Sequence, residues 1–343
     1  MKGTETDRSL ARVIENWFAV NARKLPWREK STPWGRLVSE FMAQQTQIER
    51  VAERWPQMMD RFPTPESMAH SNEQEVLSLW QGLGYYRRAK HLKATAEMIT
   101  HEFDGQVPND VEILMKFPGV GRYTAGAIAS MAFGERVPIV DGNVHRVVCR
   151  LFNKRDELVS GKWTWDIAEE LVIACSNPQV FNEGLMEIGA TVCTPKLPRC
   201  DVCPLKKHCK AYKNGTQSEI PTPKKPPKKK RVHHYSVIIE HGEKMAFEQR
   251  GENGLWAGMW QVPTVESTKK LSAKQISKRL ELQTELHRVG EFEHILSHRI
   301  ISFTVYFCKS TSDTRFSWLN RDALEELPLA SAQRKVLAVH CTA

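Results

Sequence analysis

Residues 114–128, "LMKFPGVGRYTAGAI", place a Pro-Gly-Val-Gly turn between the apolar end of one helix and the start of another. Gly119 and Gly121 lack a Cβ atom and so permit a tight turn between two helices. We expect the second helix to begin near Arg122, where its free backbone amides can bind a phosphate without reading base sequence. The stretch predicts a helix-hairpin-helix, although a single G-x-G also occurs in helical hairpins that bind nothing.

The chain around this turn has two patterns. Up to about residue 210, apolar residues recur at three-, four- and seven-residue steps, which is typical of amphipathic helices. Residues 213–234 are rich in proline and lysine and predict an extended linker. Beyond the linker, β-branched and aromatic residues predict strands, with helices between and after them. The strands are expected at 235–240, 244–250 and 299–308, and the helices at 271–286 and 320–329.

Length and composition are those of a two-domain globular protein. The chain has 343 residues, of which 41% are hydrophobic. Charged residues at its start leave no room for a signal peptide, and no apolar run could span a membrane. We therefore expect a soluble monomer with no membrane partner, cytoplasmic and nucleoid-associated in a bacterium, nuclear or mitochondrial in a eukaryote.

The positive charge is concentrated in one part of the chain. The formal net charge is +9, and residues 210–235 hold eight Lys or Arg against one acidic residue, Glu219. A solvated linker explains most of this excess, so the net charge alone does not indicate nucleic-acid binding. The segment "PPKKKRV" resembles a nuclear-import signal, but a basic linker that lies along DNA explains it equally well. We favour the linker.

Four cysteines occur close together, at Cys193, Cys200, Cys203 and Cys209, with C-x6-C-x2-C-x5-C spacing. Zinc sites with four cysteine ligands usually show two C-x2-C pairs, whereas this spacing suits a [4Fe–4S] cluster with one thiolate for each iron. Zinc remains the alternative. Because residues 193–209 include lysines and arginines, we expect the loop to present cations to phosphates. We also expect it to hold the helical domain together.

Several motifs together resemble one family. The turn at 114–128, a following "VDGNVHRV" and the cysteine spacing are similar to the endonuclease III superfamily, and within it to the MutY-type adenine DNA glycosylases. The resemblance covers residues from about 10 to 212, and "GLWAGMWQVP" further resembles the start of the MutT-like domain of that family. The segments that carry it are residues 38–51, 81–92, 118–128, 140–147, 181–193 and 254–263.

This resemblance implies a fold and a domain order. The expected fold is a mostly α helix-hairpin-helix glycosylase domain with an iron–sulfur loop, followed by an α+β Nudix (MutT)-like domain. The expected bounds are 1–212, a linker at 213–234, and 235–343. No Glu-rich helix of the hydrolases related to MutT is present, so the second domain should recognise 8-oxoguanine rather than hydrolyse a nucleotide.

The resemblance also assigns roles at the active site. Glu40 would protonate the leaving adenine and later help to activate water, and Asp141 would stabilise the positive charge that develops on the sugar. Such an acid needs a raised pKa and hence a dry pocket. Asn143 would orient Asp141 or the water, while Glu183 and Arg28 would line the adenine pocket.

Residue 123 distinguishes two mechanisms. Relatives that also cleave the strand carry a lysine there, whose amine attacks the sugar. Here the residue is Tyr123, and a phenol cannot form a Schiff base. The sequence therefore predicts base removal without strong lyase activity.

The substrate is expected to be double-stranded DNA with adenine opposite 8-oxoguanine or guanine, and the adenine must be extruded from the duplex. The resemblance implies that residues from both parts of the chain contact the DNA around the base opposite the adenine. Ala43 and Leu296 depart from the family, which has a bulkier aliphatic and a phenylalanine there, so altered lesion search or affinity is expected. The expected DNA and lesion contacts are Gln45, Thr46, Leu83, Tyr85, Gly119, Gly121, Ser297 and His298.

Two other functions remain as alternatives. An endonuclease III-like pyrimidine glycosylase with lyase activity would need an amine at position 123. A non-catalytic iron–sulfur protein that binds DNA or senses redox state would not need the two carboxylates Glu40 and Asp141. The residues favour the adenine glycosylase over both.

Overall fold

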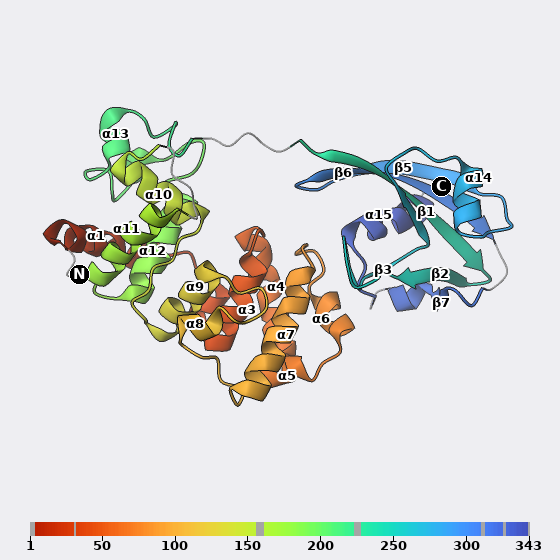
Figure 1. Cartoon of the computed structure of the whole chain (residues 1–343), viewed down its shortest axis with the longest axis horizontal. Coiled ribbons are helices and arrows are strands. Elements are labelled where there is room, and N and C mark those ends of the chain that lie inside the picture. The colour runs from red at the N-terminus through yellow and green to blue at the C-terminus, as the bar shows by residue number, and fades with distance from the viewer. Residues whose placement is uncertain are drawn as a thin grey trace. The chain divides into compact units, whose positions relative to one another are not determined.

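The computed structural model describes residues 4–30, 32–155, 161–222, 228–309, 313–324 and 327–341. Contacts between Cα atoms divide the chain into two units, which are described separately (Figure 1). The first comprises residues 1–70 and 91–225, and the second comprises 71–90 and 226–343.

The first unit is helical. Two of the helices below are exceptions: α6 belongs to the second unit, and α7 spans the boundary between the units. In chain order the helices are α1 (Glu5–Asn21), α2 (Pro26–Glu29), α3 (Pro33–Ala43), α4 (Ile48–Arg61), α5 (Pro65–Ala69), α6 (Glu73–Leu79), α7 (Arg87–Glu102), α8 (Val111–Leu114), α9 (Arg122–Phe133), α10 (Gly142–Phe152), α11 (Lys162–Ala174), α12 (Pro178–Thr191) and α13 (Lys210–Asn214). A 3-10 turn, η1 (Cys200–Val202), lies in the cysteine loop.

Polar caps begin many of these helices. Thr4 and Asp7 form a capping box at α1, and the Thr32 side chain accepts a hydrogen bond from Gly35 N at α3. Asp141 caps α10 in the same way, by accepting from Val144 N. Proline at the first position of α2, α3, α5 and α12 has the φ angle that a helix needs.

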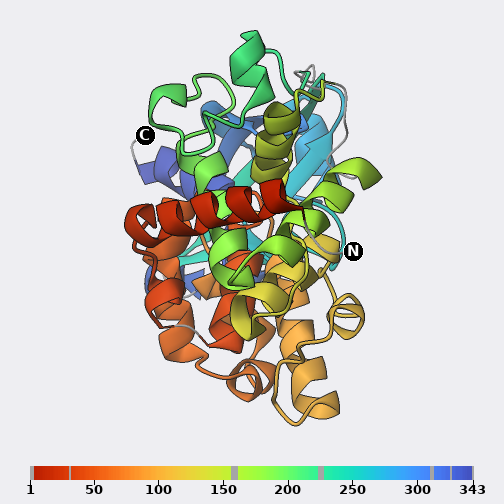
Figure 2. The same ribbon diagram turned by 90° about the vertical axis from the view of Figure 1, so that its left-hand side faces the viewer.

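One hydrophobic core lies where α1 packs against α11 and α12, and α10 against α12. Figures 1 and 2 show α1 running across these helices. Leu10 and Ile14 of α1, Val148 of α10, and Phe181 and Leu185 of α12 are each at most 3% exposed. This core fixes α10 and α12 relative to each other, and both helices carry site residues.

The helix-hairpin-helix lies at α8 and α9, as the sequence predicted. Gly119 has a φ of +77°, and a Cβ atom there would lie 2.6 Å from His91 Nδ1, so only glycine fits. Gly121 is the N-cap of α9, which begins at Arg122. The turn therefore leaves the first backbone amides of α9 as donors for an anion.

The second unit contains a seven-stranded sheet with the order β3-β2-β1-β6-β5, in which β4 also pairs with β1 and β7 with β2. β1 and β6 are parallel, and the other pairs are antiparallel. The strands are β1 (Lys230–His241), β2 (Lys244–Gln249), β3 (Trp260–Gln261), β4 (Thr264–Ser267), β5 (His287–Ile295), β6 (Arg299–Lys309) and β7 (Ser317–Asn320).

Alternation along β1 sends its side chains to two faces of this sheet. Tyr235, Val237 and Ile239 pack in one core with Ile276 of α14 (Ala273–Arg279). On the other face, α15 (Ser331–Cys341) lies against β5, β6 and β1. The layers confirm the α+β class that was predicted for this part of the chain.

Three boundaries differ from the predictions. The helix expected at 271–286 is only α14, because Leu280 and Glu281 end it and β5 begins at His287. Of the helix expected at 320–329, residues 321–324 form a short 3-10 turn, η2 (Arg321–Leu324), and residues 325 and 326 lie outside the described residues. β1 begins at Lys230, inside the expected linker, because its backbone pairs with β6. Residues 223–227 of that linker lie outside the described residues.

Within the part of the chain that the structure describes, no helix is both long and apolar enough to cross a membrane.

Candidate active site

Four helices of the first unit bring the expected catalytic residues together. Glu40 lies on α3, Tyr123 on the first turn of α9, Asp141 at the N-cap of α10, and Glu183 on α12. Tyr123, Glu183 and Asp141 all act on the ionisation of Glu40. The site is therefore assembled from residues that are up to 143 positions apart in the chain.

Glu40 is the most unusual carboxyl group of this site. It is 7% exposed, and burial raises its pKa from 4.5 to about 7. A hydrogen bond from Tyr123 and the charge of Arg36 oppose this rise, whereas the charges of Glu183 and Asp141 add to it. One oxygen, Oε2, is buried and has no hydrogen-bond partner among the described residues. A group with this pKa exchanges protons readily near neutral pH.

Tyr123 supports Glu40 directly. Its hydroxyl group forms a hydrogen bond with the Glu40 carboxyl, and burial raises the pKa of the phenol well above 10. The tyrosine is therefore neutral and serves as a hydrogen-bond donor. A neutral phenol at this position offers no nucleophilic amine to a sugar.

Asp141 has two roles, since it caps α10 and lies beside Glu40. Its Oδ1 accepts from Val144 N at 2.7 Å, and its Oδ2 accepts from Asn143 Nδ2 at 2.8 Å. Burial raises its pKa, while the bonds from Val144 and Asn143 and the charge of Arg146 lower it. Asn143 thus orients the carboxylate.

A chain of hydrogen bonds continues from Asn143 to the cysteine loop. Asn143 Oδ1 accepts from Arg146 Nη2 at 2.9 Å, and Arg146 Nε donates to the carbonyl oxygen of Cys193 at 2.7 Å. Arg146 Nη2 also donates to Gly189 O on α12 at 2.7 Å. The position of Asp141 is therefore linked through two side chains to the first cysteine of the loop.

Behind Glu40, arginines and glutamates alternate in a charge ladder, which consists of Arg23, Glu187, Arg28, Glu183 and Arg36. Arg28 Nε donates to Glu183 Oε2, and Arg28 Nη2 donates to Glu187 Oε2 at 3.1 Å. Arg36 Nη2 lies 2.9 Å from Glu183 Oε1, and Arg23 Nε lies 2.5 Å from Glu187 Oε1. Both glutamates are at most 4% exposed. Burial raises the pKa of Glu187, but its bonds from Arg23 and Arg28 outweigh that effect and hold it below its ordinary value.

The sequence analysis identified two members of this ladder, Arg28 and Glu183, and missed the other three. One signal was available: Arg36 and Glu40 are four residues apart on α3, and Glu183 and Glu187 are four apart on α12, so each pair shares a helix face. The partners across the ladder lie on different helices and could not be inferred from spacing.

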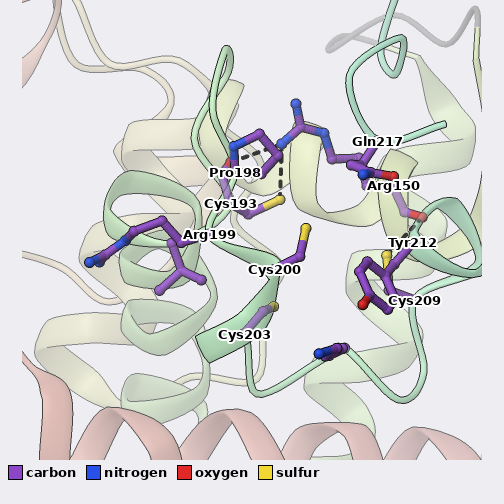
Figure 3. Close-up of a pocket in the computed structure, with 11 residues that line it drawn as sticks. Arg150, Cys193, Pro198, Arg199, Cys200, Cys203, Cys209, Tyr212 and Gln217 are labelled. Carbon is purple, nitrogen blue, oxygen red and sulfur yellow. Dashed lines mark hydrogen bonds between the residues drawn. The ribbon is translucent and has the colours of Figure 1, made fainter. Parts of the chain in front are cut away.

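The four cysteines of the loop line one small pocket, together with Arg150, Lys206 and Tyr212 (Figure 3). The side chains of Cys193, Cys200, Cys203 and Cys209 point into it from different parts of the loop. Among the described residues, no three His, Cys, Asp or Glu side chains are close enough to hold one metal ion. Four soft thiol donors spread around a shared pocket fit a larger inorganic cluster better than a single zinc ion.

Arg150 ties this pocket to α10. Its Nη1 donates to Cys193 Sγ at 3.3 Å and to Thr194 O at 2.8 Å, and its Nη2 donates to Pro195 O at 3.0 Å. Its Nε donates to Ile220 O at 2.8 Å. One buried guanidinium therefore ties the start of the cysteine segment, and Ile220 beyond its end, to α10.

The residues expected to contact DNA lie at turns. Gln45 follows α3 with a φ of +56° and is exposed, and Thr46 is half-buried beside it. A non-glycine residue with positive φ is uncommon and often marks a functional turn. Gln44 links this turn to α9, since its Nε2 donates to Thr124 Oγ1 at 3.4 Å.

In the second unit, Leu83 and Tyr85 differ from each other. Leu83 is 4% exposed and packs as a core residue, whereas Tyr85 is 47% exposed with a φ of +47°. The Arg88 guanidinium lies 5.7 Å from the centre of the Tyr85 ring and supports it. The Tyr85 hydroxyl lies 3.1 Å from Ser297 Oγ.

Ser297 and His298 form the exposed turn between β5 and β6. Leu296 N donates to Arg299 O at 2.9 Å and closes the turn, and Ser297 Oγ lies 3.3 Å from His298 Nδ1. The structure thus gathers the expected catalytic and adenine-pocket residues in the first unit. The expected lesion contacts Ser297 and Tyr85 meet in the second.

Comparisons with known proteins agree with this geometry. Residues 38–161 match the HhH-GPD superfamily of base excision DNA repair proteins, and residues 234–339 match the NUDIX domain. The adenine DNA glycosylase of Buchnera aphidicola (strain Sg) is 31% identical over 343 residues, which cover 96% of this chain and 98% of that protein. The chain belongs to the adenine DNA glycosylase family. The adenine DNA glycosylase of Rattus norvegicus is 32% identical over 402 residues, covering 96% of this chain and 77% of its own length.

Among solved structures, a thermostable thymine-DNA glycosylase superposes on the helical part with a TM-score of 0.57 and 28% identity, covering 61% of this chain and 98% of that one. The predicted fold class and enzyme class are confirmed. This adenine DNA glycosylase family member is a DNA glycosylase of base excision repair, and DNA is its macromolecular partner.

Proposed function

We propose that this enzyme removes adenine from duplex DNA in which the adenine lies opposite 8-oxoguanine or guanine. The observation that carries the proposal is Glu40: its pKa is about 7, and its buried Oε2 has no partner among the described residues. An oxygen in that state can give a proton to a base that enters the pocket. We propose adenine as this base because the relatives are adenine DNA glycosylases.

The two carboxyl groups divide the chemistry between them. Glu40 donates its proton to N7 of the extruded adenine as the bond from N9 to the sugar C1′ breaks, and the electron pair of that bond leaves with the base. Asp141, whose carboxylate oxygens accept hydrogen bonds from Asn143 Nδ2 and Val144 N, stabilises the positive charge on the sugar. Water then adds to C1′, and its proton returns to Glu40, so an abasic site and free adenine result.

The charge ladder supplies the adenine pocket in this proposal. Glu183 and Arg28 present an acceptor and several donors that are already held by other side chains. Groups that do not have to reorganise bind a planar heterocycle at a lower entropic cost. Tyr123 completes the pocket without an amine, so we propose base removal with no strong lyase activity.

Recognition of the opposite base falls to exposed residues in the proposal. Gln45 and Thr46 on one unit, and Tyr85, Ser297 and His298 on the other, are polar or aromatic groups at turns. Extrusion of a base leaves a gap that such groups can fill. The phosphates would be held by the amides at Gly119–Gly121 and by the lysines of the cysteine loop.

We also propose a [4Fe–4S] cluster in the cysteine pocket. Cys193, Cys200, Cys203 and Cys209 would hold it, and Arg150 would donate to the sulfur of Cys193 as it does here. When bound, such a cluster supplies four iron–thiolate bonds that fix the loop, and its lysines and arginines, in one shape. The reaction steps above need no other contribution from it.

Single-turnover base release tests the proposal. The substrate is a duplex with one adenine opposite 8-oxoguanine or opposite guanine, incubated with the cluster-loaded enzyme and with Glu40→Gln. Glu53→Gln is the matched control, because it makes the same change at an exposed carboxylate of α4.

We expect the wild type and Glu53→Gln to give free adenine and an abasic site that breaks only on addition of alkali. Glu40→Gln should bind the duplex and release no adenine in the same time. Intact enzyme that binds the duplex without releasing adenine would overturn the proposal, and strand cleavage without alkali would overturn its monofunctional part.

A further inference from the structure

Arg36 is a buried cation that neither the sequence analysis nor the proposed reaction uses. It lies on α3 and is 2% exposed. Its Nη2 is 2.9 Å from Oε1 of Glu183 on α12, and the two residues are 147 positions apart in the chain. Removing a guanidinium from water is costly unless it is paired, so this ion pair holds α3 and α12 in a defined relation.

The partners of Glu183 show what Arg36 does there. Arg28 Nε donates to one carboxylate oxygen of Glu183, and Arg36 takes the other. Arg28 is held in turn by Glu187 and by the carbonyl oxygen of Arg23. Arg36 is thus the end of the charge ladder on α3, the helix that carries Glu40, and it fixes the second carboxylate oxygen of Glu183.

Arg36 is also placed to act on Glu40. The two residues are four positions apart on α3, so their side chains project from the same helix face, one turn apart. Two ionisable groups face Glu40 from other elements on its pocket side, Asp141 at α10 and Glu183 on α12, and Tyr123 on α9 donates a hydrogen bond to it. Arg36 is the single cation among the described groups that act on the Glu40 carboxyl.

We propose that Arg36 is a positioning residue for base excision, which clamps Glu183 in the adenine pocket and places a fixed positive charge one helical turn from Glu40. This inference rests on the proposed role of Glu40 as the acid. Arg36 touches neither the base nor the sugar. Its charge offsets two neighbouring carboxylates, so that Glu40 can lose its proton to adenine and still take one from water near neutral pH.

The expected electrostatic effects have opposite signs for the two partners. Burial, Glu183 and Asp141 raise the pKa of Glu40, whereas Tyr123 and Arg36 lower it. Loss of the Arg36 charge should therefore raise the pKa above about 7, and loss of the Glu183 charge should lower it. Because an acid must be protonated to act, the rate should fall at high pH wherever this pKa lies.

The test is the pH dependence of single-turnover adenine release by the cluster-loaded enzyme. Arg36→Gln should move the alkaline fall in rate upward by about one pH unit, as expected for loss of one nearby opposite charge. Glu183→Gln should move it downward. Arg36→Lys keeps the charge but not the planar fork, so its profile should stay near that of the wild type while its rate falls.

Two controls keep the result independent of folding. The pH at which the rate falls does not depend on the fraction of enzyme that is active, so a partly unfolded variant still reports it. Arg12→Gln, an exposed change on α1, should leave both rate and profile unchanged. In the double variant Arg36→Gln/Glu183→Gln the two shifts should largely cancel, which is the signature of a coupled pair.

Three outcomes are decisive. Opposite shifts that cancel in the double variant support the assignment. A slow Arg36→Gln whose profile coincides with that of the wild type would show that Arg36 only fills space, and would overturn it. A wild type that releases no adenine at any pH would instead overturn the proposed function on which the assignment rests.

Discussion

The two regions that serve the proposed reaction are built in opposite ways. In the first unit, Glu40 and Glu183 are at most 7% exposed, and Arg28 on α2, Arg36 on α3 and Tyr123 on α9 hold them. In the second unit, Ser297 and His298 lie exposed in a turn that one backbone hydrogen bond closes. Proton transfer needs a dry, fixed site, whereas contact with a base in DNA needs an accessible one.

This difference has an energetic consequence. The buried site holds a carboxyl group in an environment that disfavours its charge, which makes the fold less stable in exchange for reactivity. The exposed turn holds no such group. Substitutions in the first region should therefore change both rate and stability, and substitutions in the second should change selectivity alone.

The largest effect is expected for Glu40→Gln. Loss of the proton donor should slow adenine release by about 10²- to 10⁴-fold. The same change should stabilise the fold at pH 8 by up to about 3 kcal/mol, because raising the pKa from 4.5 to about 7 disfavours the charged carboxyl by that amount. Urea unfolding of the two proteins at several pH values measures the difference.

The sign of this stability difference depends on pH in a defined way. The folded-state pKa lies above the unfolded one, so the wild type has its full stability below about pH 4.5 and loses it as the pH rises through about 7. The advantage of Glu40→Gln should therefore be absent at pH 4.5 and complete at pH 8. An advantage that is the same at both pH values would contradict the raised pKa of Glu40.

A smaller effect is expected for Arg146→Gln. This change removes the hydrogen bonds from Arg146 to Asn143 and to the backbone of Cys193. Asn143, which orients Asp141, is then no longer held in place. We expect adenine release to slow by about 10- to 100-fold, as for other groups that orient an active-site side chain. Arg146→Lys should recover part of the rate. An unchanged rate in Arg146→Gln would show that Asn143 and the N-cap bond from Val144 hold Asp141 without support from Arg146.

Tyr123→Phe should have a modest effect that appears mainly at high pH. The hydroxyl group stabilises the charged form of Glu40, so its loss should raise the pKa above about 7. The alkaline fall in rate should move upward by less than about one pH unit. The abasic product should stay uncleaved without alkali. A downward move would mean that the phenol stabilises the protonated carboxyl instead.

The smallest effect is expected at the exposed turn. Ser297→Ala removes one hydrogen-bonding group, which is worth about 1 kcal/mol or roughly a fivefold change in rate or affinity. We expect the preference for adenine opposite 8-oxoguanine over guanine to fall by that factor, with no change in unfolding free energy. A loss of stability, or an equal loss on both substrates, would show that the turn is structural.

Local patterns in the sequence identified much of this architecture. The glycine turn at Gly119, the strands β1, β2 and β6, and the loop whose four cysteines line one pocket all follow from short-range spacing or from the φ angles that glycine permits. Within the described part of 320–329 the expected helix was wrong, because the same apolar spacing is compatible with the 3-10 turn at 321–324 and the bridge from Leu329 to Trp260.

The sequence by itself determined the family, the fold class and the identity of the candidate acid, since motifs are read along the chain. Only the tertiary structure decided what surrounds that acid. Arg36 and Glu187 each share a helix face with a candidate site residue, but spacing does not reveal their partners outside that helix, and a charged residue in a helix is usually solvated. In the packed fold these charged residues are buried and form ion pairs with residues that lie 140 or more positions away in the chain. Neither burial nor such pairing can be read from local spacing.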